Sequence, residues 1–212
     1  MRFQTLLFDL DETLYPSSSG LWMAIRDRIN AYMHERMGFP PEQIEVLREQ
    51  FFRDYGTTLR GLQVNYTVNM EEYLAFVHNV PLVVYLHPNP ELRGVIEALP
   101  ARKYIFTNAD RAHANRVLEV LGLQGLFDGI LDVHTFAPYC KPMPESFKLA
   151  LQAAGSPEPR SCALLDDQAR ITRAARRLGL FTILVGKDSA GEDADAALKK
   201  WTDLPGLLDG RI

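Results

Sequence analysis

The chain has 212 residues, of which 47% are hydrophobic and 24% charged, and its formal net charge at pH 7 is −4. This composition is typical of a globular protein and excludes intrinsic disorder, which needs fewer apolar residues and a larger charge imbalance. The small acidic excess argues against binding to nucleic-acid polymers or anionic membranes, which attract basic proteins. A chain of this length can form one large domain, or a domain with a smaller insert, around a substantial core.

The cysteines and the start of the chain indicate the compartment. Cys140 and Cys162 are too few for a disulfide framework and have no partner at zinc-ligand spacing, so we expect reduced thiols. Asp9 interrupts the apolar start too early for a signal peptide. No segment has the roughly 20 apolar residues of a membrane span. We therefore expect a cytoplasmic protein. A monomer or a weak dimer is our expectation for its assembly, although no motif in the sequence indicates it.

Short apolar runs rich in β-branched or aromatic residues predict five strands. They cover residues 3–8, 103–106, 129–133, 162–165 and 181–185. Nearly continuous hydrophobicity is typical of parallel strands that are buried on both faces. Between the later runs lie helical patterns, at residues 91–99, 110–122, 144–154 and from 168 to Gly179. This alternation predicts an α/β fold, a Rossmann-like doubly wound parallel sheet.

The segment 16–85 breaks the alternation, because it contains no convincing strand and a long helical periodicity. Its first helix carries apolar residues at a spacing of four: Leu21, Ile25, Ile29 and Met33. Pro41 begins a second helix, and two more are predicted near 57–64 and 70–77. We interpret 16–85 as an α-helical cap domain inserted after the first strand, and 1–15 with 86–212 as the core. A separate N-terminal domain would leave the first strand outside the sheet.

Polar side chains follow four of the predicted strands. In chain order they are Asp9 and Asp11, Thr107 and Asn108, Lys141, and Asp166 with Asp167. Because the carboxyl ends of parallel strands line one crevice, we expect these groups to meet there. Clustered carboxylates repel one another unless a cation is present, and Mg²⁺ prefers oxygen ligands. The pattern therefore predicts a metal site.

The same residue types suit phosphoryl transfer. Mg²⁺ neutralises a phosphoryl group, Lys141 adds a fixed positive charge, and Thr107 and the Asn108 amide can donate hydrogen bonds to its oxygens. Of the two leading acids, Asp9 and Asp11, one can attack phosphorus while the other handles the proton of the leaving group. We therefore predict that the substrate is a small-molecule phosphate ester.

These segments resemble the four ordered motifs of the haloacid dehalogenase superfamily of phosphatases. The matching segments are residues 8–15, 106–109, 140–142 and 165–167. The resemblance implies that Asp9 is the nucleophile and forms an aspartyl-phosphate intermediate, and that Asp11 protonates the leaving alkoxide and then activates water. It also implies Mg²⁺ on Asp9, on the backbone carbonyl of Asp11 and on Asp166, with Asp167 binding through water or orienting the site.

Further segments resemble the pyrimidine 5′-nucleotidase-like branch of the superfamily. They are residues 55–62, residues 107–109 together with His113, and residues 126–130. Within the cap, Tyr55, Thr58 and Arg60 are predicted to face the substrate, the alternative being a helix start with a solvated face. For His113 a surface or packing position is favoured over catalysis. Four arginines are interpreted as a solvated helix face: Arg170, Arg173, Arg176 and Arg177.

The resulting prediction is a Mg²⁺-dependent phosphomonoester hydrolase, with a nucleoside 5′-monophosphate as the first choice of substrate. A sugar-phosphate phosphatase or a phosphomutase of the same superfamily remains open. So does a catalytically weakened phospho-ligand-binding module, because Gln168 and Ile171 stand where relatives often carry serine and asparagine. A dehalogenase is disfavoured because it does not require the acid–base group of Asp11. The motif order and the large insert disfavour a signalling receiver.

Overall fold

The computed structural model describes residues 3–209, so residues 1–2 and 210–212 of the predicted core lie outside it. Within this range, six strands form one sheet in the order β3-β2-β1-β4-β5-β6, and every neighbouring pair is parallel. The strands are β1 (Thr5–Phe8), β2 (Arg102–Phe106), β3 (Gly129–Leu131), β4 (Cys162–Asp166), β5 (Phe181–Val185) and β6 (Ala196–Leu198). The predicted α/β fold with a parallel sheet is confirmed.

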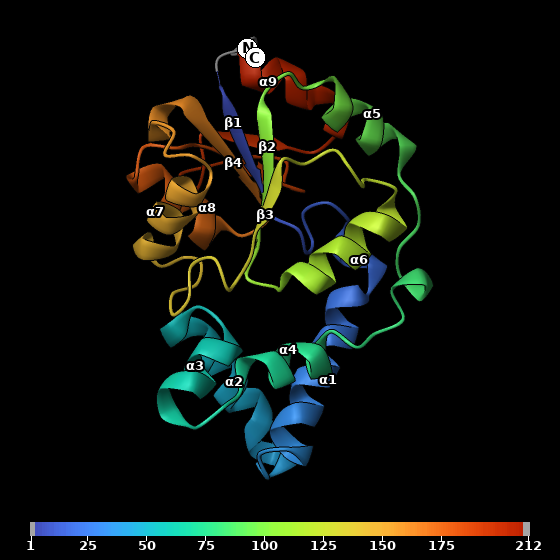
Figure 1. The fold of residues 1–212 in the computed structure, drawn as a ribbon, viewed down its shortest axis with the longest axis vertical. Helices are drawn as coiled ribbons and strands as arrows, with labels where there is room; N and C mark the ends of the chain where they lie inside the picture. Colours follow the sequence, from blue (N-terminus) through green and yellow to red (C-terminus); the bar gives the residue numbers. More distant parts are fainter. Residues whose placement is uncertain (1–2, 210–212) are drawn as a thin grey trace.

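Helices cover both faces of this sheet (Figure 1). The core helices are α5 (Pro90–Ala98), α6 (Arg111–Leu121), α7 (Pro144–Ala153), α8 (Ala169–Arg177) and α9 (Leu204–Asp209). Leu6 and Phe8 belong to the apolar cluster that contains the buried residues of α5 and α6, whereas Leu7 belongs to the cluster of α7 and α8. Both faces of β1 are therefore buried, which is why its sequence is continuously apolar.

Four helices lie between β1 and α5 in the chain and gather at one end of the molecule, apart from the sheet (Figure 1). They are α1 (Leu21–Glu35), α2 (Pro41–Tyr55), α3 (Thr58–Asn65) and α4 (Met70–Val77). Each of the four helices predicted between 16 and 85 is confirmed, and we call them the cap helices. None of the helices in the described part of the chain has the length and apolar character needed to cross a bilayer.

The sequence patterns missed several short elements. β6 and α9 were not predicted, and neither were the 3₁₀ segments Ser17–Ser19, Leu82–Val84, Pro159–Ser161 and Trp201–Asp203. The first strand is shorter than predicted, since it begins at Thr5. Both cysteines are free, as expected, and both are buried.

The contact between α2 and α3 requires a glycine. A Cβ added to Gly61 of α3 would lie 2.3 Å from Cγ of Phe51, whose ring is buried in the cap. Gly94 of α5 is a contrasting case, because a Cβ there would meet nothing within 4 Å. The two helical glycines thus differ in the space beside them: Gly61 is buried against Phe51, and Gly94 is exposed.

We expect opposite effects when each glycine is replaced by alanine. Gly61→Ala should lower the free energy of unfolding by about 1–3 kcal/mol, because the Phe51 ring must move out of its packed position. Gly94→Ala should raise it by about 0.5–1 kcal/mol, because alanine has the higher helix propensity. Urea denaturation of both variants measures the difference. A Gly61→Ala protein as stable as the parent would contradict the packing.

Candidate active site

The sheet register brings the polar residues to one edge. Phe8 of β1 lies level with Ile105 of β2 and with Leu165 of β4. The three strands run in the same direction, so the next residues of each lie at the same edge of the sheet. There the backbone N–H of Asp9 donates to the Leu165 carbonyl at 2.9 Å. The residues that follow these strands therefore converge, as predicted from the parallel arrangement.

Lys141 joins two of the carboxylates. Its Nζ lies 2.7 Å from Oδ1 of Asp9 and 2.9 Å from Oδ2 of Asp166, and its side chain is 1% exposed. Although burial lowers the pKa of Lys141, the neighbouring Asp166 and Asp9 outweigh it and raise the pKa above its usual value. Lys141 is therefore a fixed positive charge inside the site.

Asn108 and Thr107 follow β2 and have different tasks. The Asn108 side chain holds the backbone of Lys141, since Oδ1 accepts from its N–H at 2.8 Å and Nδ2 donates to its carbonyl at 3.1 Å. Nδ2 carries a second hydrogen, which this contact with Lys141 does not use. The Thr107 hydroxyl accepts from the N–H of Ala109 at 3.0 Å, which leaves its own hydrogen to donate.

Three carboxylates form a group that fits a divalent cation. Asp9, Asp166 and Asp167 each offer an oxygen, and these oxygens lie within 4.8 Å of one another. Thr13 links the group, because its hydroxyl donates to Oδ2 of Asp9 at 3.0 Å and accepts from the N–H of Asp167 at 3.1 Å. Glu12, with φ of 60° in the left-handed region, turns the chain between Asp9 and Thr13.

The electrostatics of this group favour an added positive charge. Burial raises the pKa of Asp9 well above its usual value, Lys141 opposes this only in part, and Asp166 and Asp167 add to it. Burial and the neighbouring Asp166 raise the pKa of Asp167 to about 7. Since the single lysine does not balance the three acids and all the donors are hard oxygens, the set suits Mg²⁺.

Asp11 is bound differently from the other acids. The Tyr15 hydroxyl donates to its Oδ1 at 2.7 Å, and Nε2 of His113 lies 3.1 Å from the same oxygen. Burial raises the pKa of Asp11, but the His113 ring lowers it by charge and hydrogen bonding, and the net shift is downward. The His113 side chain is fully buried, so of the two predicted positions, surface or packing, the structure shows the packing position.

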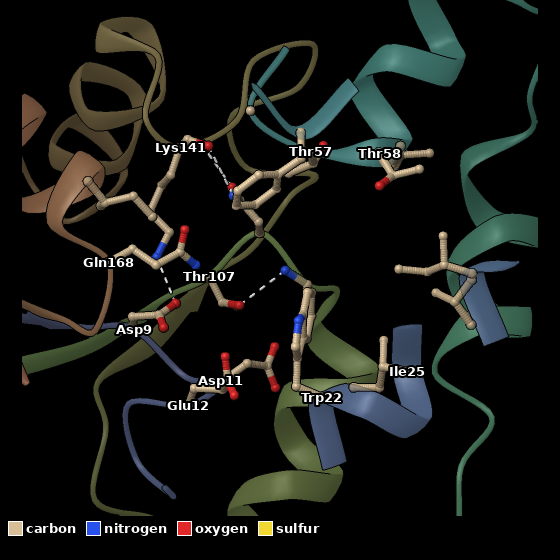
Figure 2. A pocket seen from close by; sticks show the side chains of 18 of the residues that line it. Asp9, Asp11, Glu12, Trp22, Ile25, Thr57, Thr58, Thr107, Lys141 and Gln168 are labelled. Atoms are coloured by element: carbon tan, nitrogen blue, oxygen red, sulfur yellow. Dashed lines mark hydrogen bonds and ion pairs between the residues drawn. The ribbon is translucent and has the colours of Figure 1, made fainter. Parts of the chain in front are cut away.

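A cavity of about 560 Å³ connects these groups to the cap helices. Figure 2 shows Asp9, Asp11, Thr107 and Lys141 on one side, and Trp22, Ile25, Thr57 and Thr58 facing them. The rest of the lining includes the apolar and aromatic side chains Ile29, Phe52, Leu59, Tyr73, Leu74 and Val77, together with Arg48 and Glu49. The cavity thus has a charged end in the core and a largely apolar end in the cap.

Of the three cap residues predicted to face the substrate, only one lines this cavity. Thr58 is buried and lines the cavity, whereas Tyr55 and Arg60 are not among the lining residues. Arg60 borders a separate shallow recess with Gln63 and Tyr139. Trp22 and Phe52, which the motif pattern did not single out, line the cavity instead.

Arg170 is a contact between core and cap and not part of a solvated face. Its guanidinium donates to the carbonyls of Phe52 at 3.0 Å and Gly56 at 2.9 Å, at the end of α2, and stacks 3.5 Å above the Phe52 ring. Its Nε donates to Oε1 of Gln168, whose own N–H binds Asp166. Arg173 and Arg176 instead pair with Asp193 and Asp195 near the surface.

The structure also shows what Gln168 and Ile171 do, the two residues after Asp166 and Asp167 that differ from the family pattern. Gln168 supports Asp166 through its backbone N–H, at 2.9 Å from Oδ1, and its side chain holds Arg170. Ile171 is 1% exposed and packs in the cluster beneath β4. Both therefore have structural roles in this chain.

We expect Arg170→Ala to raise KM about tenfold and to change kcat by less than about threefold. The physical reason is that the variant loses hydrogen bonds from a charged group, worth about 1.5–3 kcal/mol each, that hold the cap and not the reacting atoms. Steady-state kinetics of phosphate-ester hydrolysis measures both constants. Arg173→Ala, one helical turn away, is the matched control and should leave them unchanged. A loss confined to kcat would contradict this role.

Comparison with known proteins agrees with the geometry. The haloacid dehalogenase-like hydrolase family matches residues 3–179. The chain belongs to this family. The finer resemblance to its pyrimidine 5′-nucleotidase-like branch stays a prediction.

Two curated relatives and one solved structure are similar along the chain. Phosphate metabolism protein 8 of Saccharomyces cerevisiae is 27% identical over 236 residues, covering 99% of this chain and 74% of the yeast protein. Glyceraldehyde 3-phosphate phosphatase of Methanocaldococcus jannaschii is 24% identical over 225 residues, covering 96% and 95%. The magnesium-bound HAD-hydrolase YfnB of Bacillus subtilis has a TM-score of 0.67 at 18% identity, covering 99% and 100% of the two chains. This last likeness shows the fold.

Proposed function

We propose that this hydrolase is a Mg²⁺-dependent phosphomonoesterase that acts through an aspartyl-phosphate intermediate. The supporting observation is that Asp9, Asp11, Thr107 and Lys141 line the core end of one cavity, beside a cluster of three carboxylates. Members of its family are generally phosphatases, and a curated relative is named as one. When bound, Mg²⁺ supplies positive charge that neutralises the oxygens of the phosphoryl group.

The first half-reaction uses Asp9 and Asp11. An oxygen of the Asp9 carboxylate attacks phosphorus, the bond between phosphorus and the ester oxygen breaks, and Asp11 gives its proton to the leaving oxygen, which departs as an alcohol. The resting Asp11 has a lowered pKa. An anionic phosphoryl group brought beside it favours its protonated form, because like charges disfavour ionisation.

The second half-reaction reverses these roles. Asp11, now ionised, takes a proton from a water molecule whose oxygen attacks the phosphorus of the aspartyl phosphate. The bond between phosphorus and Asp9 breaks, and inorganic phosphate leaves. Lys141 and Thr107 stabilise the transferring group in both steps, through the fixed charge and the free hydroxyl hydrogen described above.

The shape of the cavity supports a nucleoside 5′-monophosphate as the first substrate. Its apolar end is lined by the aromatic side chains of Trp22, Phe52 and Tyr73, which offer flat surfaces for a base. A sugar phosphate is the second candidate, since Arg48 and Glu49 also line the cavity and could bind hydroxyl groups. The name of the archaeal relative is consistent with this second candidate.

A panel of phosphate esters with Mg²⁺ or with chelator tests the proposal. We expect release of inorganic phosphate that requires Mg²⁺, and a higher kcat/KM for uridine 5′-monophosphate than for ribose 5-phosphate, which lacks only the base. Equal values would favour the sugar-phosphate phosphatase. Isomerisation of a sugar phosphate without phosphate release would indicate a phosphomutase. Binding without turnover across the panel would favour the weakened phospho-ligand-binding module.

A further inference from the structure

Two stacked histidines connect the cap to Asp11. The rings of His78 and His113 lie 4.1 Å apart at their centroids and are inclined by 18°. His113 belongs to α6 in the core, whereas His78 is the C-cap residue that follows α4 in the cap. Both side chains are at least nine-tenths buried. The predicted chemistry uses neither of them.

Asp110 holds the two histidines together. Its Oδ1 accepts from the backbone N–H of His113 at 2.7 Å, which caps α6, and its Oδ2 lies 2.7 Å from Nδ1 of His78. The guanidinium of Arg116 donates to the carbonyls of His78 at 2.9 Å and Val80 at 2.7 Å. The segment after α4 is thus fixed against α6, and with it the ring that covers His113.

The contacts of Asp11 are one-sided. Tyr15 and His113 both bind Oδ1. Within the described part of the chain, no protein group binds Oδ2. Because Oδ1 is an acceptor, Nε2 of the His113 ring carries the hydrogen of this contact. This assignment agrees with Nδ1 of His113, which is buried without a partner. Two donors on Oδ1 leave Oδ2 as the oxygen that carries the proton of the acid form.

We propose that His113 is a positioning residue that, together with Tyr15, turns Oδ2 of Asp11 toward the ester oxygen of the substrate, and that His78 of the cap fixes the His113 ring. This inference rests on the proposed function, in which Asp11 protonates the leaving group. The proton moves from Oδ2 to the leaving oxygen, and the hydrogen bonds on Oδ1 persist. If so, the rate of proton transfer from Asp11 to the leaving oxygen depends on how the cap helices are positioned against the core.

The leaving group distinguishes positioning from a general structural role. The alkoxide of benzyl phosphate needs a proton to depart, whereas p-nitrophenolate is stable as an anion. The ratio kcat/KM reports the steps up to departure of the leaving group, so a misplaced Asp11 should affect the two esters unequally. Damage to the fold or to the phosphate site would instead affect both to the same extent.

His113→Asn and His113→Gln are a matched pair for this test, because both introduce an amide but only glutamine reaches the position of Nε2. We expect His113→Asn to lower kcat/KM for benzyl phosphate about 10- to 100-fold, a part of the effect of general acid catalysis. For p-nitrophenyl phosphate the loss should stay below about threefold, and His113→Gln should restore most of the benzyl phosphate activity. Tyr15→Phe should show the same selectivity, and the exposed His87→Leu no effect.

Other outcomes overturn the inference in distinguishable ways. Equal losses for both esters, or no loss in His113→Asn and Tyr15→Phe, would exclude the positioning role while leaving the phosphatase intact. Asp11→Asn serves as the reference, because it should discriminate between the esters at least as strongly. If wild-type protein with Mg²⁺ hydrolyses neither ester, the proposed function fails and this role with it. Thermal unfolding of each variant verifies that it folds. If the His113 variants do not fold, Tyr15→Phe alone tests the positioning role.

Discussion

Asp9→Asn should lower phosphatase turnover by at least about 10³-fold, the order seen when a covalent nucleophile is removed. The amide has no anionic oxygen to attack phosphorus, so no aspartyl phosphate can form. The fold should survive, because the asparagine oxygen can take the place of Oδ1, which accepts from Lys141, while its NH2 group can donate to the Thr13 hydroxyl in the place of Oδ2. Because Asp166 still pairs with Lys141 and one of three mutually repelling acids becomes neutral, we expect the free energy of unfolding to be unchanged or higher.

Hydrolysis of p-nitrophenyl phosphate in MgCl₂, together with thermal unfolding, measures both parts of this expectation. Asp188→Asn is the matched control, because it makes the same chemical change at an exposed side chain. It should retain full activity. A folded Asp9→Asn protein that keeps most of its turnover would exclude the covalent mechanism.

Lys141→Met should have the largest effect on stability. The ammonium group is the shared partner of Asp9 and Asp166, which are both buried, and its loss leaves their charges uncompensated. Removing one partner of a buried ion pair costs about 3–5 kcal/mol. We also expect kcat to fall by about 10²-fold or more, because the fixed charge on the transferring group is lost.

Urea denaturation in EDTA and in MgCl₂ measures this cost. We expect the destabilisation to be smaller in MgCl₂, because a cation bound to the carboxylates stabilises the folded state by mass action. Lys199→Met is the matched control: Lys199 pairs with Asp188 at the surface, and its loss should cost less than about 1 kcal/mol. Equal stability of the two variants would contradict the buried charge network.

Most of the fold could be predicted because its signals are local. The strands of the sheet centre are continuously apolar, and Asn89 and Asp110 accept hydrogen bonds at the helix starts where the pattern placed them. β6 could not be predicted in this way, since Ala196–Leu198 is three residues long and follows a polar segment. Its strand conformation comes from pairing with β5, which is a tertiary interaction.

The core of the candidate site was predicted better than its surroundings. Asp9 follows β1, Asp166 ends β4 and Lys141 lies in the loop after β3, so the three meet at one edge of a parallel sheet. That relation can be inferred from the order of strands. The position of His113 could have been inferred as well, since it lies four residues before Val117, on the buried face of α6. The role of Arg170 could not, because its partners are carbonyls at the end of α2, and backbone groups leave no trace in the sequence.

The central place of β1 has a consequence for biosynthesis. Its neighbours are β2 and β4, which are encoded far downstream, beyond the cap helices and, for β4, beyond most of the core. While the nascent chain ends before Cys162, one edge of β1 has no strand to pair with, and its apolar side chains lack part of their cover. Such long-range pairing slows folding, and until it is complete the unpaired edge of β1 can pair with strands of other chains. We therefore expect fragments that stop ahead of β4 to aggregate, whereas the cap helices can already pack locally at that stage.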